Sequence, residues 1–329
     1  MRKSLTNNFP CDLHCHTNRS DGYDTYQELI DHAVRLGMFA IGVTDHDIHP
    51  VTLITLADGD EVDPVLYAAE RYLTLIPGYE FSTNTRIDDV HICGYGLQWT
   101  HPDLQAEVAA STRSKTDAYE ELCQRLIILD MPIDWQEDIL HFSAPDGQRI
   151  SRRPDEVQRK HIFEAMAAKG YAESWSAAKL LVQDNPDLNV RRRKIDSVEA
   201  IHLIQRCGGA SVLAHPYLID EIITVPDQPE VTRTDFIDTL IEAGLDGIEI
   251  RYTYDKTTYK GDLTSEQIET EVRDKYQNRL PILSGGSDYH GGDKKGEKQL
   301  RSLGERGLTI EEFVSIRDLF GQKIFIQDI

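Results

Sequence analysis

Residues 12–22, DLHCHTNRSDG, place two histidines one residue apart directly after a short apolar stretch, and Asp21 follows five residues after the second. Successive side chains of a β-strand point to opposite faces, so His14 and His16 share one face while Cys15 takes the other. Two imidazoles on one face at the end of a strand are typical of metal ligands. The stretch therefore predicts a strand that ends in a metal site.

Short apolar, β-branched segments alternate with amphipathic helical segments along the rest of the chain. We expect strands at 11–16, 39–45, 73–80, 89–96, 210–215, 246–251 and 281–287, and helices at 24–37, 62–72, 102–130, 196–207, 233–244 and 264–278. This alternation is typical of βα units around a parallel sheet, and it indicates an α/β barrel related to the (β/α)8 type.

One segment interrupts the alternation. Residues 131–195 carry no strand pattern and indicate helices and loops, between the fourth and fifth strands. We therefore predict a barrel made of residues 1–130 and 196–329, with 131–195 as a mostly helical cap insertion.

Ionisable residues gather where the predicted strands end, which is where barrels of this kind carry their catalytic residues. His16 ends the first strand, TDHD (44–47) the second, Glu80 the third, AHP (214–216) the fifth and GSDYH (286–290) the seventh, while His91 lies within the fourth. The predicted metal ligands are His14, His16, Asp21, His46, Glu80, His91, His215, Asp288 and His290. For Asp45 we expect a role in orienting a neighbouring imidazole rather than in binding metal.

The composition of this ligand set indicates its chemistry. Six imidazoles with several carboxylates suit Zn, Mn or Fe and are too rich in nitrogen for calcium. The set exceeds the needs of one ion, so it predicts two or three divalent transition metals. Adjacent metals lower the pKa of a bound water and clamp both the attacking and the leaving oxygen of a displacement at phosphorus. We therefore predict a phosphoesterase that uses a metal-bridging hydroxide.

The charge of the chain limits its partners. With 35 Lys and Arg against 56 Asp and Glu, the formal net charge is −21, which repels long duplex nucleic acid and anionic membranes. Nine of the basic residues fall within 149–160 and 191–194, so the insertion is expected to bind phosphate. The N-terminal residues lack a signal-peptide core, and the five cysteines form no C-x-x-C pair, so we expect a reduced, cytoplasmic protein.

The motifs resemble those of the PHP (polymerase and histidinol phosphatase) family of metal-dependent phosphoesterases. The shared patterns are D-L-H-x-H-T-x-x-S-D-G at 12–22, T-D-H-D at 44–47, the glutamate of I-P-G-Y-E at 80, the histidine at 91, A-H-P at 214–216 and G-S-D-x-H at 286–290. The resemblance implies a distorted seven-stranded (β/α)7 TIM-like barrel. It also implies one metal on His14, His16, Glu80 and Asp288, a second on His91 and His215 with Glu80 as a bridge, and a third on Asp21, His46 and His290.

Within that family, residues 159–216 resemble the members that dephosphorylate nucleoside 3′,5′-bisphosphates and trim short single-stranded oligonucleotides. Those members read R-P-H-I-A where this chain has Arg159-Lys160-His161-Ile162-Phe163. The resemblance implies that Arg159, His161, Arg192 and Arg193 bind substrate. Glu80, Asp45 and His161 are the predicted catalytic residues, with His161 as the proton donor to the leaving oxygen.

Three other functions compete with a nucleotide phosphatase or exonuclease. A histidinol-phosphate phosphatase would use the same ligands, and only the basic insertion argues for a substrate with a second phosphate. Hydrolases of the amidohydrolase superfamily also begin with H-x-H, but they generally need a lysine on the fourth strand, where this chain has His91. The third alternative is a non-catalytic metal-binding module, which the intact ligand set disfavours.

Overall fold

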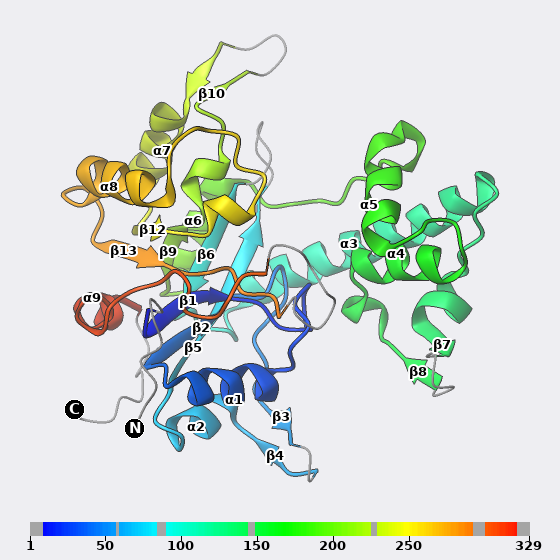
Figure 1. The fold of residues 1–329 in the computed structure, drawn as a ribbon, viewed down its shortest axis with the longest axis horizontal. Helices are drawn as coiled ribbons and strands as arrows, with labels where there is room; N and C mark the ends of the chain where they lie inside the picture. Colours follow the sequence, from blue (N-terminus) through cyan, green and yellow to red (C-terminus); the bar gives the residue numbers. More distant parts are fainter. Residues whose placement is uncertain are drawn as a thin grey trace. The chain divides into compact units, whose positions relative to one another are not determined.

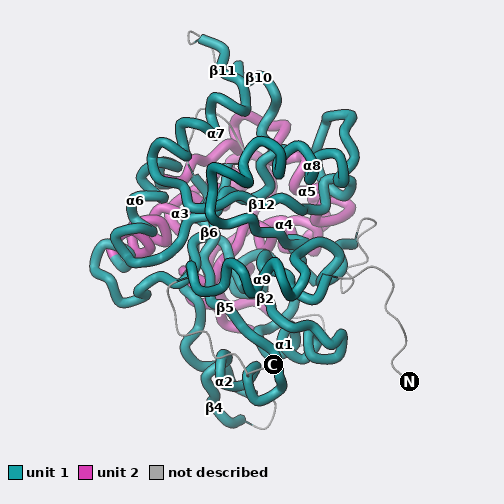
Figure 2. The backbone as a smooth tube through the Cα atoms, turned by 90° about the vertical axis from the view of Figure 1, so that its left-hand side faces the viewer, with its two compact units in different colours: residues 1–105, 195–329 teal, residues 106–194 magenta. Residues whose placement is uncertain are grey.

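The computed structural model describes residues 9–56, 59–83, 90–143, 149–224, 229–291 and 300–320. The chain divides into two compact units, shown in Figure 2. Unit 1 consists of Met1–Gln105 and Ile195–Ile329, and unit 2 of Ala106–Lys194.

Unit 1 is built around a seven-stranded sheet (Figure 1). Its strands are β1 (Cys11–Cys15), β2 (Ala40–Val43), β5 (Thr74–Ser82), β6 (His91–Tyr95), β9 (Ala210–Leu213), β12 (Gly247–Arg251) and β13 (Ile282–Gly285), and they pair in this order. The two edges approach each other, since Cys15 bridges Tyr289 and the carboxylate of Asp12 accepts hydrogen bonds from the backbone N and Oγ of Ser287 at 3.0 and 2.5 Å. The sheet is therefore nearly closed into a barrel, which confirms the predicted fold class.

The direction of β6 differs from the all-parallel sheet that we predicted. β6 runs antiparallel to both β5 and β9, with Glu80 opposite Cys93 and Ser82 opposite His91. Residues 83–90 are too few for the crossover that a parallel pair requires, so β6 must turn back along β5. As a result, the first residue of β6, His91, lies at the pole of the barrel where the parallel strands end.

Helices with local end signals surround these strands. Helix α1 (Tyr26–Leu36) begins with a capping box, in which Thr25 Oγ1 accepts from Glu28 N at 3.2 Å and the Glu28 carboxylate accepts from Thr25 N at 2.8 Å. It ends at Gly37, whose φ of 70° suits the left-handed conformation of a C-cap. The other α-helices of this unit are α2 (Pro64–Ala69), α6 (Ser197–Arg206), α7 (Arg233–Glu242), α8 (Ser265–Tyr276) and α9 (Ile310–Ile316).

Two small hairpins extend unit 1, and the sequence patterns did not predict them. They pair β3 (Ile54–Thr55) with β4 (Glu61–Val62) and β10 (Ile222–Ile223) with β11 (Val231–Thr232). Strands of two residues are too short for a recognisable alternation of apolar and polar side chains, which explains why they were missed.

Unit 2 has its own hydrophobic core. Its elements are α3 (Pro102–Ile128), the hairpin of β7 (His141–Ser143) and β8 (Arg149–Ser151), α4 (Arg159–Ala168) and α5 (Trp175–Asp184). Leu122 and Leu126 of α3 belong to one buried cluster with Ile162 and Met166 of α4, so the unit begins within α3 at 106 and not at 131. The β7–β8 hairpin also corrects our expectation of a segment without strands. No helix in the described parts of the chain is long and apolar enough to cross a membrane.

Candidate metal centre

Glu80, the inward-facing glutamate of β5, is the centre of the candidate site. Its side chain is 1% exposed, and its Oε2 lies 3.2 Å from His14 Nε2, 3.2 Å from His16 Nε2 and 3.1 Å from His46 Nδ1. Burial by itself would raise the pKa of Glu80, but its contacts with the surrounding imidazoles hold that pKa well below its ordinary value. Glu80 is therefore a carboxylate that three imidazoles approach from one side.

The second carboxylate oxygen of Glu80 faces two further histidines. Oε1 lies 2.9 Å from His91 Nδ1 and 3.3 Å from His215 Nε2. His91 reaches this position because β6 is antiparallel, and His215 because it lies two residues after the carboxyl end of β9. Five imidazoles from four segments of the barrel thus converge on one buried side chain.

Asp288 supplies a second buried carboxylate. Its Oδ1 lies 3.0 Å from His16 Nε2 and 3.6 Å from His14 Nε2, while its Oδ2 accepts from Tyr252 OH at 2.7 Å and from Arg301 Nη1. Burial opposes ionisation of Asp288, but the Arg301 guanidinium and the nearby histidines lower its pKa well below the usual range. Tyr252 and Arg301 thus occupy one oxygen of Asp288 and leave the other directed at the histidines of β1.

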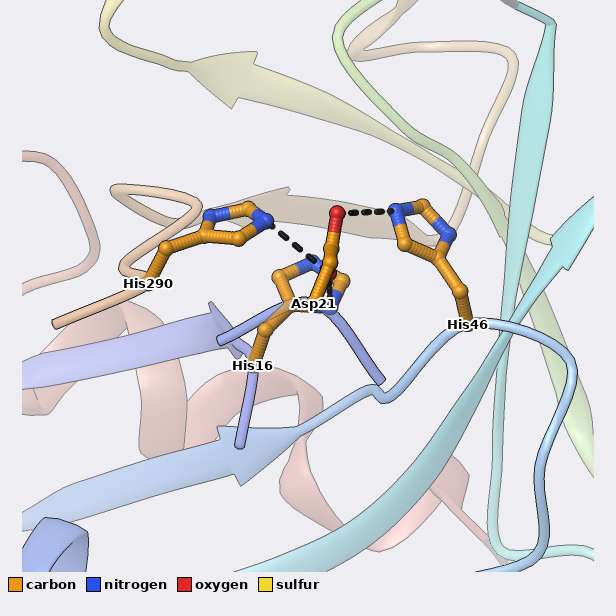
Figure 3. Close-up of side chains that lie close together, drawn as sticks. All are labelled: His16, Asp21, His46 and His290. Carbon is orange, nitrogen blue, oxygen red and sulfur yellow. Dashed lines mark ion pairs between the residues drawn. The ribbon is translucent and has the colours of Figure 1, made fainter. Parts of the chain in front are cut away.

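Asp21 stands at the more open side of the site. Figure 3 shows it between the rings of His46 and His290, with His16 beside it. Asp21 Oδ1 lies 3.2 Å from His290 Nε2 and 3.8 Å from His16 Nδ1, and Oδ2 lies 4.0 Å from His46 Nε2. The Asp21 side chain is 44% exposed and His16 is buried, so this group of four reaches from the interior of the site to solvent.

The geometry of these donors fits divalent transition metals. His14 Nε2 and His16 Nε2 lie 3.1 Å apart, and His46 Nδ1 is buried without a hydrogen bond of normal geometry despite its contact with Glu80. Burial lowers the pKa of His46 to about 4, so its ring is neutral and has a lone pair to offer. Four overlapping groups have their ligand atoms within 4.8 Å of one another: His16, Asp21, His46 and His290; His14, His16 and Asp288; His46, Glu80 and His91; and His14, Glu80 and Cys93. Nitrogen and oxygen donors so close together match the preferences of Zn, Mn or Fe.

Asp45 lies beside the site but contacts different groups from those we expected. Its carboxylate accepts from Thr17 N at 2.8 Å, Thr17 Oγ1 at 2.6 Å and Ser20 Oγ at 2.5 Å, and Ser20 Oγ is 3.5 Å from His16 Nδ1. Asp45 therefore holds the loop that follows β1, and these hydrogen bonds connect it to the imidazole of His16 through Ser20.

Three residues of the site were not predicted: Glu249, Tyr252 and Arg301. Glu249 of β12 contacts His14 Nδ1 and the backbone N of His215, and the other two hold Asp288. A signal for Glu249 was present, because a charged residue between Ile248 and Ile250 is unusual in a buried strand. Arg301 and Tyr252 gave no comparable signal.

The predicted substrate-binding residues belong to unit 2. Arg159 and His161 lie in the first turn of α4, and His161 Nδ1 accepts a hydrogen bond from Gln158 N at 3.1 Å. Arg193 forms a bidentate ion pair with Glu107 at 2.5 and 2.7 Å, a role that competes with phosphate binding. Arg192 precedes it in the segment that leads out of unit 2. The structure thus brings the nine predicted metal ligands together in unit 1, and the four predicted substrate residues lie in the other unit.

Comparison with known proteins gives the same assignment. Residues 12–132 match the PHP domain. A phosphoribosyl 1,2-cyclic phosphate 1,2-diphosphodiesterase of Eggerthella lenta is 27% identical over 284 residues, covering 85% of this chain and 94% of that protein. The 5′-3′ exoribonuclease Rnm of Escherichia coli is 28% identical over 62% of this chain and 64% of its own length. A 3′,5′-nucleoside bisphosphate phosphatase of Chromobacterium violaceum is 24% identical over 62% of this chain and 66% of its own length.

A solved structure from Bifidobacterium adolescentis, described as a metal-dependent phosphoesterase, shares the fold. Its TM-score is 0.65 at 22% identity, and the match covers 94% of both chains. The barrel, the converging histidines and carboxylates, and these matches agree with one another. Residues 12–132 carry the match to the PHP domain, and the chain resembles the metal-dependent phosphoesterases of that family.

Proposed function

We propose that this protein hydrolyses phosphoric esters of small phosphorylated ribose compounds at a cluster of two or three divalent transition metals. The observation that carries the proposal is the convergence of five imidazoles on the buried Glu80. A purely structural role would place five imidazoles, three of them buried, around one buried carboxylate. Burying so many ionisable groups together is costly unless metal ions bind among them.

The proposed ligand assignment uses all nine residues. His14, His16, Glu80 and Asp288 would hold one ion, His91 and His215 a second with Glu80 between the two, and Asp21, His46 and His290 a third. When bound, these ions supply the positive charge that lowers the pKa of a water molecule and stabilises phosphoryl oxygens.

Protein groups complete the proposed site. Tyr252 and Arg301 direct Asp288 Oδ1 toward His16, so the aspartate offers a single oxygen. The Arg301 side chain is 20% exposed, and we assign to its guanidinium a second function in attracting the anionic substrate. Asp45 supports His16 through Ser20.

The substrate class follows from chemistry that the relatives have in common. By their names, they act on a phosphoribosyl cyclic phosphate, on RNA and on a nucleoside bisphosphate, all of which contain phosphorylated ribose. For this chain we propose a nucleoside 3′,5′-bisphosphate, from which the 3′-phosphate is removed while the 5′-phosphate remains. Arg159 is proposed to bind the remaining phosphate, since its Nε is buried without a hydrogen-bond partner in the described part of the chain.

A second candidate substrate is a phosphoribosyl 1,2-cyclic phosphate. The relative with that activity aligns with 85% of this chain and 94% of its own length, which includes the insertion as well as the barrel. Both candidates are ribose compounds with phosphate at two positions, so the proposed second phosphate site would serve either.

Product analysis on a panel of substrates tests the proposal, with phosphate release measured for the monoesters and chromatography used for the cyclic phosphate and the oligonucleotides, whose diester cleavage liberates no inorganic phosphate. The metal-replete protein is assayed with adenosine 3′,5′-bisphosphate, a 3′-mononucleotide, phosphoribosyl 1,2-cyclic phosphate, histidinol phosphate and di- to pentanucleotides, with the Glu80→Gln variant as the inactive control. We expect kcat/KM to be highest for a compound with two ribose phosphates, because the second phosphate orients the first. Turnover of histidinol phosphate or a 3′-mononucleotide with equal efficiency would refute the substrate assignment.

A further inference from the structure

We infer that Glu249 is a positioning residue that sets the orientation of two metal ligands at once, His14 and His215. This inference rests on the metal centre proposed above. It concerns a side chain of β12 that has no place among the nine proposed ligands. Glu249 is 1% exposed, so its charge is shared entirely with protein groups or with the ions themselves.

The first contact of Glu249 determines which nitrogen of His14 faces the ions. Glu249 Oε1 lies 2.7 Å from His14 Nδ1, and both side chains are fully buried. An ionised carboxylate only accepts hydrogen bonds, so the proton of the neutral imidazole must be on Nδ1. The lone pair is then on Nε2, the atom that lies 3.2 Å from Glu80 Oε2 and 3.1 Å from His16 Nε2.

The second contact of Glu249 acts on the backbone of His215. Glu249 Oε2 accepts a hydrogen bond from His215 N at 2.7 Å. His215 has φ 32° and ψ 56°, a left-handed conformation that a residue with a Cβ rarely adopts. The hydrogen bond stabilises this turn directly after β9, and the turn carries the imidazole to within 3.3 Å of Glu80 Oε1.

One carboxylate therefore couples ligands of two different ions. Under the proposed assignment, His14 belongs to the first ion and His215 to the second. A carboxylate that accepts from a ligating histidine also raises the basicity of that ligand. The two contacts together require that both oxygens of Glu249 accept a hydrogen bond. A glutamine has only one acceptor oxygen. In Glu249→Gln, that oxygen can accept from His14 Nδ1 or from His215 N, but not from both at their present positions.

The test compares Glu249→Gln with a matched control, Asp246→Asn. Asp246 joins the same pair of strands, since its Oδ2 accepts from Ser211 N and Ser211 Oγ at 2.9 Å, but it lies at the opposite end of β12. Purified proteins are titrated with Zn²⁺ and Co²⁺ against a chelator, with metal content determined by elemental analysis and the Co²⁺ absorption spectrum recorded. We expect Glu249→Gln to bind the ions on His14 and His215 about 10- to 100-fold more weakly. The ion on Asp21, His46 and His290 and the Asp246→Asn variant should bind as in the wild type.

If Glu249→Gln bound the metals with wild-type affinity and gave a wild-type Co²⁺ spectrum, the inference about Glu249 would be wrong, while the proposed metal centre would still stand. A wild-type chain that binds no metal would instead refute the proposed function.

A second measurement needs no variant, so it decides the question even if Glu249→Gln does not fold. In ¹⁵N-histidine-labelled, Zn²⁺-loaded wild-type protein, we expect His14 to carry its proton on Nδ1 and to bind zinc through Nε2. Coordination of His14 through Nδ1 would overturn the inference.

Discussion

At the scale of single residues, Glu80 is the side chain that contacts most of the proposed metal ligands. Its two oxygens contact five imidazoles, and its position opposite Cys93 places it deep in the barrel. Because both oxygens face candidate ligands, removal of Glu80 affects two proposed ions, whereas removal of an outer ligand such as Asp21 affects one.

We therefore predict that Glu80→Ala lowers the metal content by more than one ion per chain. The physical reason is that the five imidazoles alone cannot neutralise adjacent divalent ions, so their mutual repulsion increases. Elemental analysis after metal-replete purification measures the effect, with Glu70→Ala as the control because the Glu70 side chain is 76% exposed. Unchanged metal content in Glu80→Ala would show that the ligand assignment is wrong.

At the scale of elements, an ion-pair network holds the end of β12 against two helices. Arg251, the last residue of β12, donates to Glu312 of α9 at 2.6 and 3.0 Å, and Arg273 of α8 contacts the same carboxylate. Glu312 also completes the capping box of α9 with Thr309. The next residue after Arg251 is Tyr252, so this network supports the segment that carries a contact of Asp288.

Glu312 should make the stability of the fold depend on pH. Burial opposes its ionisation, but the hydrogen bonds from Arg251, Thr309 N and Arg273 lower its pKa from 4.5 to about 2. The native state thus favours the ionised form more than the unfolded state does. This contribution to stability is fully present above pH 4.5 and is lost as the pH falls through 2.

We predict that Glu312→Gln lowers the free energy of unfolding by about 1.5–3 kcal/mol at pH 7, the range for hydrogen bonds to charged groups. Urea denaturation at a series of pH values should show the difference between wild type and variant narrowing as the pH falls below 4.5. Glu311→Gln, one residue earlier and exposed, is the control and should stay close to the wild type. A difference that does not change with pH would contradict the assigned pKa.

At the scale of the whole molecule, the proposed function assigns different tasks to the two units. Unit 1 holds every proposed metal ligand, and unit 2 holds the residues proposed to bind the second phosphate. Several arginines of unit 2 are already paired with acids, including Arg193 with Glu107 and Arg149 with Glu137. Arg159, whose Nε is buried without a hydrogen-bond partner in the described part of the chain, is therefore the better candidate for phosphate binding.

We predict that Arg159→Ala and Arg192→Ala raise KM for a bisphosphate substrate about 10- to 100-fold, while kcat and metal content stay unchanged. A hydrogen bond to a charged group is worth about 1.5–3 kcal/mol, and interactions made equally in ground and transition states affect KM alone. Steady-state kinetics with metal analysis measure the effect, and Lys179→Ala on the exposed side of α5 is the control. Unchanged kinetics in both arginine variants would mean that these arginines bind no substrate.

The seven barrel strands were predictable because they depend on local patterns, and the residues that we propose as metal ligands stand in local motifs at the ends of those strands. The alternation that places His14 and His16 on one face, and the short apolar runs of β2, β9 and β12, need no knowledge of distant residues. The family resemblance contributed the ligand assignment. The capping box and the C-terminal glycine of α1 are also local signals, because each depends on residues a few positions apart in the sequence.

Contacts between distant segments were decided only by the tertiary structure. The direction of β6 depends on its pairing with β5 and β9, and it determines that His91 faces Glu80. Glu249 meets His14 across 235 residues of sequence, and Arg193 meets Glu107 across 86. Periodicity and motif spacing describe which face of an element a side chain occupies. They do not describe which residue that side chain will contact. Packing decides the contact, because side chains that are remote in sequence become neighbours only when the sheet closes.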